Sequence, residues 1–212
     1  MPIAPPSRTA YTVLVSRDLI DRRLATTASR AMVAFSVLAL YVRVRPAPAA
    51  WERRVSAWAV HLDGLVGWAW KLGSVGAVAV GLLAALAIGI VRRRPLAVAL
   101  SLVAVPSLVL VQTVVKPLVG REAGRVYGFP SGHAVSSGFL VVALVAALWV
   151  PPGRARVALV AGGALAGTAC GAAAISGQSH LPTDVAGSWL WVLGWAAATA
   201  WWVRRSCIGP EP

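Results

Sequence analysis

Charged residues, cysteines and metal-binding clusters are all scarce in this chain. Charged residues make up only 13% of its 212 residues, against 58% hydrophobic residues. This balance excludes an ordinary soluble domain. The two cysteines, Cys170 and Cys207, lie in an apolar stretch and in the C-terminal tail, and they predict neither a disulfide framework nor a metal site. Because no cluster of carboxylates or thiolates is present to hold an ion, neither a metal nor another cofactor is expected.

Long apolar segments make up most of the chain. About 20 mostly apolar residues are needed to span a bilayer as a helix. Five segments of this kind are evident: 73–91, 96–115, 133–150, 157–175 and 185–203. A sixth segment, 27–42, is weaker because Arg30 lies in its first turns. The sequence therefore predicts an all-α, polytopic membrane protein with six transmembrane helices.

These segments are predicted to form one membrane domain, residues 27–206, between two tails. Residues 1–26 are polar and lack the pattern of a cleavable signal peptide, so they are expected to form an N-terminal tail, and 207–212 a C-terminal one. Residues 51–71 combine four tryptophans with charged residues. This mixture is typical of an amphipathic helix in the membrane interface, with anchoring as its simpler role and a substrate gate as the alternative.

The distribution of positive charge predicts how the domain is oriented. The net charge of +13 does not indicate a nucleic-acid partner, because the basic residues separate apolar segments instead of forming one stripe. Six spans place both termini on one side, and more of the 20 basic residues lie on that side. By the positive-inside rule, the termini are expected in the cytoplasm and the protein in the plasma membrane as a multi-pass protein.

Four ionisable residues fall at span ends on the face opposite the termini. In chain order, they are Lys116, His133, His180 and Asp184, at the end of the third span, the start of the fourth, after the fifth and at the start of the sixth. Ionisable groups beside membrane spans are functional by default. The sequence therefore predicts one site at the outer face of the membrane.

The residue types in this site suit phosphoryl transfer. A neutral imidazole can attack phosphorus when a carboxylate fixes its tautomer, and a residue at i+4 on a helical turn lies on the same side. His180 and Asp184 have this spacing, and Pro182 is favourable in the first turn of a helix that would carry Asp184. His133 is the candidate general acid for the leaving oxygen.

Phosphate-binding groups are predicted around the same site. Ser131 precedes an apolar helix as a candidate N-cap, so the backbone N–H groups after it would face an anion, and Gly132 lets the backbone approach closely. Lys116 would add a point charge, with simple extension toward the interface as its alternative role. Arg121 would add a bidentate fork, whereas Glu122 is expected to point away from phosphate or to pair with an arginine.

The stretch 116–187 resembles the type 2 phosphatidic acid phosphatase superfamily. The pattern of that superfamily is Lys, six residues, Arg-Pro; then Pro-Ser-Gly-His; then Ser-Arg, five residues, His, three residues, Asp. Here Pro130-Ser131-Gly132-His133 is intact, and His180 with Asp184 completes the last element. The resemblance implies a six-span membrane enzyme that hydrolyses a lipid phosphate or an isoprenyl (di)phosphate through a phosphohistidine intermediate.

Both arginines of the superfamily pattern are replaced in this chain. Ala123-Gly124 stands where the pattern has Arg-Pro, and Ala173-Ala174 stands where it has Ser-Arg. Arg121 is a partial substitute for the first arginine, whereas the second has no basic residue near it in sequence. A phosphate monoester needs more positive charge in its pocket than a phosphodiester does.

Two alternatives to a phosphatase therefore stay open. One is a lipid headgroup phosphotransferase that acts on a phosphodiester lipid, because related transferases keep the histidines and the aspartate without the arginines. The other is a non-catalytic relative that binds lipid. A basic residue from the region 43–71, such as Arg53 or Arg54, would favour the monoester substrate if it reached the site.

Overall fold

The computed structural model of this chain describes residues 8–123 and 126–207, and within them it is almost wholly helical. The long helices are α1 (Arg8–Val44), α4 (Val75–Val91), α5 (Pro95–Leu110), α7 (Gly132–Ala147), α8 (Arg154–Ser176) and α9 (Pro182–Cys207). The short ones are α2 (Ala50–Ala59), η1 (Val60–Leu62), α3 (Asp63–Val66), η2 (Gly67–Gly73), the π-helical turn η3 (Val111–Val115) and α6 (Lys116–Val119). A small antiparallel hairpin joins β1 (Glu122–Ala123) to β2 (Val126–Tyr127). The all-α prediction is confirmed, and the long helices lie where the six apolar segments were predicted.

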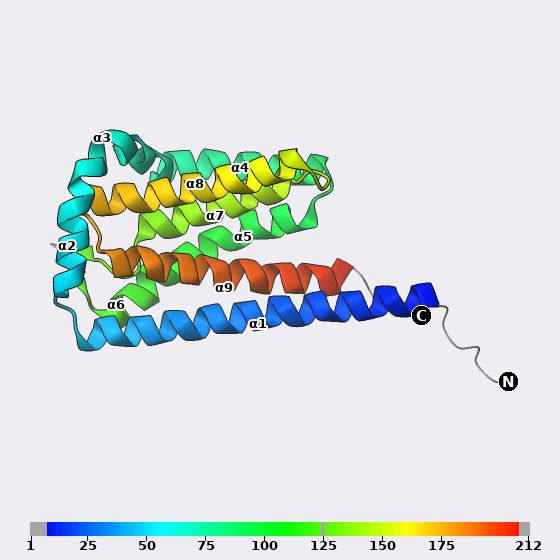
Figure 1. Cartoon of the computed structure of the whole chain (residues 1–212), viewed down its shortest axis with the longest axis horizontal. Helices are drawn as coiled ribbons and strands as arrows, with labels where there is room; N and C mark the ends of the chain where they lie inside the picture. Colours follow the sequence, from blue (N-terminus) through cyan, green and yellow to red (C-terminus); the bar gives the residue numbers. More distant parts are fainter. Residues whose placement is uncertain (1–7, 124–125, 208–212) are drawn as a thin grey trace.

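The long helices lie alongside one another, and the short helix α2 runs across one end of the bundle (Figure 1). We call this the capped end; α3 and α6 also lie there, whereas the α4–α5 and α7–α8 turns lie at the opposite end. Helix α7 is central, because it packs against α4, α5, α8 and α9, and α1 packs mainly along α9. The capped end therefore brings together segments that are far apart in the sequence.

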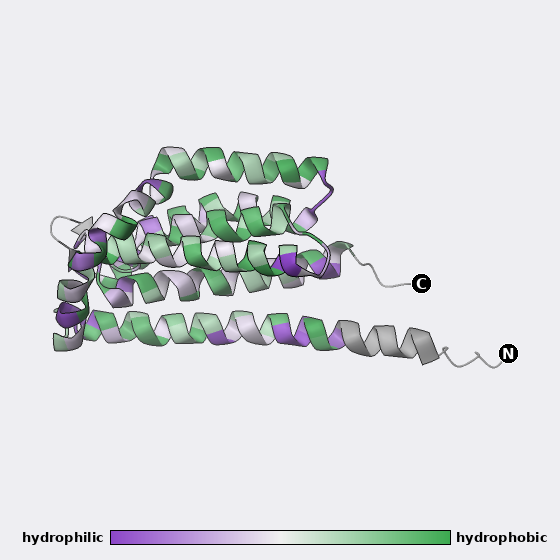
Figure 2. Cartoon of the chain, turned by 45° about the horizontal axis from the view of Figure 1, so that its top comes forward, coloured by the Kyte–Doolittle hydropathy of each residue, from purple (hydrophilic) through white to green (hydrophobic). Residues whose placement is uncertain are grey.

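Several helices are long and apolar enough to cross a membrane. Three qualify by length and composition: Asp18–Val44 of α1, the continuous stretch Pro95–Val119, and α8. A fourth results if Ala50–Gly73 and α4, which are bent by 64° at the break between them, count as one span. Helix α7 is apolar but has only 16 residues, fewer than the ~20 that a span needs. Figure 2 shows the hydrophobic residues along the long helices and many hydrophilic ones near their ends. These features are those of a membrane protein.

The helical structure of α1 extends into the segment that was expected to be a polar tail. It begins at Arg8, well before residue 27. Charges near its start are paired within the fold: the carboxylate of Asp21 lies 3.0 Å from Arg204 Nε and 4.0 Å from Arg205 Nε of α9. Asp18 pairs with Arg22 one turn later at 3.4 Å. Residues 18–26 therefore continue α1 within the bundle. From the sequence alone, their charges predict a polar tail, but α9 supplies partners for Asp21.

An aromatic cluster at the capped end packs the segment before α7 against α1 and α9. The ring centroid of Phe35 lies 5.7 Å from that of Phe129 and 4.9 Å from that of Trp191. The Trp191 indole N–H also donates to Ser107 Oγ at 2.7 Å, so this buried polar group is satisfied. An ideal Cβ on Gly187 would lie 2.5 Å from two atoms of the Phe129 ring. Glycine is thus required at that point for α9 to approach the segment that leads into α7.

Candidate active site

The capped end brings together the ionisable residues that the sequence placed at span ends. Lys116 begins α6, His133 lies in the first turn of α7, and His180 lies in the turn between α8 and α9. Asp184 lies in the first turn of α9 and is 1% exposed. His133 is close enough to interact electrostatically with His180 and Lys116, and Lys116 with Asp184. The polar groups of three helices and one turn therefore form one site.

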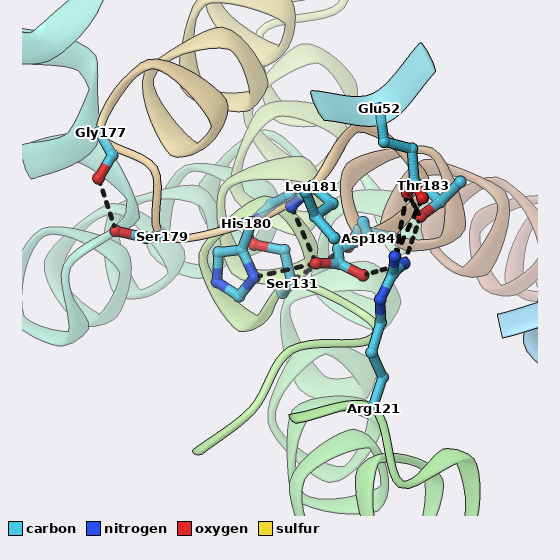
Figure 3. Close-up of polar contacts among 11 residues, drawn as sticks. Glu52, Arg121, Ser131, Gly177, Ser179, His180, Leu181, Thr183 and Asp184 are labelled. Carbon is cyan, nitrogen blue, oxygen red and sulfur yellow. Dashed lines mark hydrogen bonds and ion pairs between the residues drawn. The ribbon is translucent and has the colours of Figure 1, made fainter. Parts of the chain in front are cut away.

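His180 and Asp184 form a pair across one helical turn. Nδ1 of His180 lies 3.7 Å from Oδ2 of Asp184, and the imidazole is 10% exposed (Figure 3). The same carboxylate oxygen accepts the Leu181 N–H at 2.9 Å, which holds it at the start of α9. The His180 backbone N–H donates to Ala174 O at 3.1 Å and ties the turn to α8. With Nδ1 directed at the carboxylate, Nε2 is the nitrogen left to act on a substrate.

Ser131 is the N-cap of α7, as the sequence predicts. Its hydroxyl accepts the Ala134 N–H at 3.3 Å, and its side chain is fully buried. Its backbone joins α7 to α9, because the Ser131 N–H donates to Asp184 O at 3.2 Å and Ser188 Oγ donates to Ser131 O at 3.0 Å. Since the Ser131 hydroxyl is used by the cap, the groups available to an anion are backbone N–H groups of the first turn of α7.

Lys116 is directed at the backbone of Gly132. An ideal Cβ on Gly132 would lie 3.8 Å from Lys116 Nζ and 2.6 Å from Gln112 Nε2. The absence of a side chain at Gly132 therefore admits Gln112 to the start of α7, whereas Lys116 lies at ordinary van der Waals distance from that point. Sequence reasoning missed Gln112; its signal is a polar residue one turn before Lys116 within an otherwise apolar stretch.

The structure does not place Arg121 where a phosphate clamp was expected. Its Nη2 lies 3.1 Å from both carboxylate oxygens of Glu52, and its Nη1 donates to Asp184 Oδ1 at 3.2 Å and to Thr183 Oγ1 at 2.6 Å. Figure 3 shows these contacts of Arg121, whose side chain is 2% exposed. A guanidinium buried this deeply needs carboxylate partners. The fork of Arg121 therefore binds two carboxylates of the protein and is not directed at a phosphate.

Glu52 is the residue of this network that sequence reasoning missed. It lies on α2, is 1% exposed, and accepts both the Thr183 hydroxyl at 2.5 Å and the Ala49 N–H at 2.8 Å. In the sequence it stands beside Arg53 and Arg54, where a carboxylate reads as part of a solvated charged surface. Its partner Arg121 is 69 residues away, so no local pattern indicates the pair.

An indole ring covers His133, the second histidine of the site. Trp70 of η2 stacks on His133 with centroids 3.7 Å apart and ring planes at 16°. An ideal Cβ on Gly73 would lie 2.9 Å from His133 Cδ2, so η2 comes close to the imidazole only because residue 73 is glycine. The stack fixes the plane of the His133 ring and covers one of its faces.

The superfamily pattern has an arginine at positions 123 and 174, and the structure describes the side chain at 174 only. Ala174 is fully buried against Ala134 and Val185, and Trp70 packs on this cluster. The space that an arginine at 174 would need is therefore filled by apolar groups. Residue 124 and the side chain of Ala123 lie outside the described part of the chain.

A cleft of about 640 Å³ opens beside the pair of His180 and Asp184. It lies between α2 and the α8–α9 turn, and its wall includes His180 and Asp184. Its lining residues are Pro48, Arg53, Ser56, Ala57, Glu122, Gln178, Ser179, His180, Leu181 and Asp184. Arg53 therefore reaches the site from α2, whereas Arg54 is not among the lining residues. Glu122 is exposed and belongs to the same cleft.

No protein-family model, no curated protein and no solved structure matches this chain. Among residues 8–123 and 126–207, no group of three or more histidine, cysteine, aspartate or glutamate side chains is arranged to hold a metal ion. A function for this chain is therefore inferred from the chemistry of the site itself.

Proposed function

We propose that this chain is an integral membrane lipid phosphatase that acts on a lipid phosphate or an isoprenyl (di)phosphate through a phosphohistidine intermediate. The observation that carries the proposal is the pair of His180 and buried Asp184, 3.7 Å apart, at the end of a helical bundle where His133 and Lys116 also lie. The motif resemblance of the stretch 116–187 to the type 2 phosphatidic acid phosphatase superfamily supports the same reaction.

The reaction follows from the roles that these groups can take. Nε2 of His180 attacks phosphorus, a P–N bond forms and the P–O bond to the lipid breaks, while His133 gives its proton to the leaving oxygen. Asp184, directed at Nδ1, stabilises the positive charge that develops on the imidazole. His133 then takes a proton from water, the water oxygen attacks phosphorus, and the P–N bond breaks. A phosphate monoester gives the lipid alcohol and inorganic phosphate, whereas a diphosphate attacked at its terminal phosphorus gives the lipid monophosphate and inorganic phosphate. Both histidines return to their starting states.

The substrate phosphate is bound by Lys116 and by the amides at the start of α7. Lys116 is 9% exposed and lies against Gly132, so its charge acts where little water screens it. Arg121 acts indirectly, because it holds Asp184 in place and balances the charge of that carboxylate. The lipid tail stays in the bilayer beside the bundle while its phosphate reaches the capped end.

In the membrane, all six long helices are proposed to cross the plasma membrane, with the capped end outside and both termini in the cytoplasm. The ends of the helices support this orientation: Arg92, Arg93 and Arg94 follow α4, and Arg204 and Arg205 lie in the last turn of α9, all at the end opposite the site. Positive charge of this kind marks the cytoplasmic side.

A second candidate function is transfer of a phospho-headgroup between lipids. It is favoured by the apolar packing around Ala174, which leaves no room for the second arginine of the phosphatase pattern. In that reaction, an acceptor alcohol would replace water in the second step. Supplying the purified chain with a phosphodiester lipid and an acceptor lipid, and looking for a new lipid product, separates transfer from hydrolysis.

The proposal is tested with the purified full chain in detergent micelles. Phosphate release from phosphatidate and from a polyprenyl diphosphate is measured for the unaltered chain, for His180→Ala and for His61→Ala. His61 is exposed on η1 and does not line the cleft, so it serves as the matched control. We expect His180→Ala to abolish release and His61→Ala to leave it unchanged. Equal phosphate release by the unaltered chain and His180→Ala would refute the phosphatase.

A further inference from the structure

The site as described holds one cation for a substrate phosphate. Arg121 is already shared by Glu52 and Asp184, so Lys116 is the remaining described cation at the start of α7. A phosphate monoester or a terminal diphosphate carries more negative charge than a phosphodiester, and it needs more than one positive group to hold it. A second cation is therefore to be sought on the wall of the cleft.

One face of α2 forms that wall. Arg53, Ser56 and Ala57, at i, i+3 and i+4, lie on the same side of the helix and all line the cleft with His180. The guanidinium of Arg53 is held from one side, because its Nη1 donates to the carbonyl oxygen of Pro48. The cation is thus fixed beside the cleft by a neutral acceptor.

The cleft wall also carries a polar group without a partner. Ser56 Oγ is enclosed and makes no hydrogen bond within the described residues. An enclosed hydroxyl without a partner is uncommon in folded proteins and calls for a ligand or a water. Ser56 lies one turn from Arg53 on the same face, but its hydroxyl is enclosed, so direct contact with an anion in the cleft falls to Arg53.

Helix α2 is fixed in position by the residue next to Arg53. Glu52 is buried and bonded to Arg121 and Thr183, so the start of α2 cannot shift without breaking a buried charge pair. Arg53 and Glu52 are neighbours on different faces of the helix: one faces the cleft and the other the protein interior. The position of Arg53 is therefore set by the same network that holds Asp184.

We propose that Arg53 is the anion clamp of this site and takes the place of the arginines absent at positions 123 and 174. The substrate class that follows is a lipid bearing a terminal phosphate, as a monoester or a diphosphate, in preference to a phosphodiester lipid. This specificity rests on the proposed function, whereas the anion site itself rests on the cleft alone.

Glu122 places a negative charge on the wall of the same cleft, opposite in sign to Arg53. Its carboxylate is exposed and lines the same cleft, so it repels a phosphate that Arg53 attracts. Neutralising each residue should therefore change phosphate affinity in opposite directions. A pocket that bound an uncharged ligand would respond to neither change.

The test measures binding of inorganic phosphate to the full chain in micelles, by phosphorus NMR titration, for Arg53→Met, Arg54→Met and Glu122→Gln. Arg54 is the matched control because it is exposed on the same helix but does not line the cleft. Loss of a charge-assisted contact weakens binding by about tenfold to a hundredfold, which is the rise in Kd expected for Arg53→Met. We expect Arg54→Met to bind within about twofold of the unaltered chain and Glu122→Gln to bind more tightly.

The outcomes separate this proposal from the proposed function. If Arg53→Met binds phosphate as Arg54→Met does, or if the unaltered chain binds none, the clamp is wrong, whatever the rate of hydrolysis. If binding depends on Arg53 but the unaltered chain releases no phosphate from either phosphatidate or a polyprenyl diphosphate, the phosphatase is wrong and the anion site stands. With both correct, Arg53→Met raises KM for phosphatidate while kcat changes little, and Arg53→Lys restores part of the affinity.

Discussion

Replacing Glu52 by glutamine should destabilise the whole bundle, because it removes one charge from a buried network. Glu52 and Arg121 are 1% and 2% exposed, and two contacts of 3.1 Å join them. Removing one partner of a buried ion pair costs about 3–5 kcal/mol when nothing replaces it. Glutamine keeps the shape and one acceptor oxygen, so the loss for Glu52→Gln should lie nearer the 1.5–3 kcal/mol of a charged hydrogen bond, about 2 kcal/mol.

The measurement is thermal unfolding of the purified chain in detergent, followed by circular dichroism. A domain of this size loses about 2–4 °C of Tm per kcal/mol, so Glu52→Gln should lower Tm by roughly 4–8 °C. Asp18→Asn is the matched control, because it makes the same chemical change in an exposed pair whose side chains are 71% and 80% accessible. Exposed pairs contribute about 0–1 kcal/mol. Equal Tm values for the two variants would refute the buried network.

Two further predictions concern packing at the site. Gly187→Ala should destabilise the chain by about 1–3 kcal/mol, since its Cβ would lie 2.5 Å from the buried Phe129 ring. Gly162→Ala is the control, because nothing lies within 4 Å of the added atom. It should be neutral or slightly stabilising, since alanine favours a helix. Thermal unfolding of both variants checks this, and a similar Tm for the two would contradict the close approach of α9 to Phe129. Trp70→Ala should lower kcat for phosphate release by about twofold to tenfold, the effect of losing an aromatic stack of 0.5–1.5 kcal/mol on His133. Trp70→Phe should recover most of this rate, and a Trp70→Phe rate as low as that of Trp70→Ala would show that stacking is not what positions His133.

The sequence predicts those parts of the fold that local patterns determine. The apolar stretch 157–175 lies within α8 (Arg154–Ser176), because an apolar run of that length has few other stable conformations in a membrane protein. Ser131 caps α7 and Asp184 lies in the first turn of α9, since capping depends on residues within one turn. The number of spans is less certain from composition, because helices such as α7 are apolar but short.

The sequence does not predict which distant residues become partners. Arg121 stands near the start of the motif region, and its sequence context indicates a phosphate clamp, yet Glu52 from α2 lies 69 residues away and occupies its fork. Trp70 is one of four tryptophans in a segment read as interfacial, and only the packing of η2 on α7 selects it to stack on His133. Such choices depend on the tertiary arrangement, which a local pattern does not encode.

Arg121 pairs with both Glu52 of α2 and Asp184, and this shared pairing restricts how a ligand can reach the site. Lifting α2 off the bundle would separate Glu52 from Arg121 and leave opposite charges exposed to an apolar surrounding. Sliding a phosphate sideways, through the opening between α2 and the turn that carries His180, separates no ions. Helix α2 is therefore expected to stay in place over the end of the bundle. A lipid is expected to enter from the side, through the opening between α2 and the turn that carries His180, along the membrane surface.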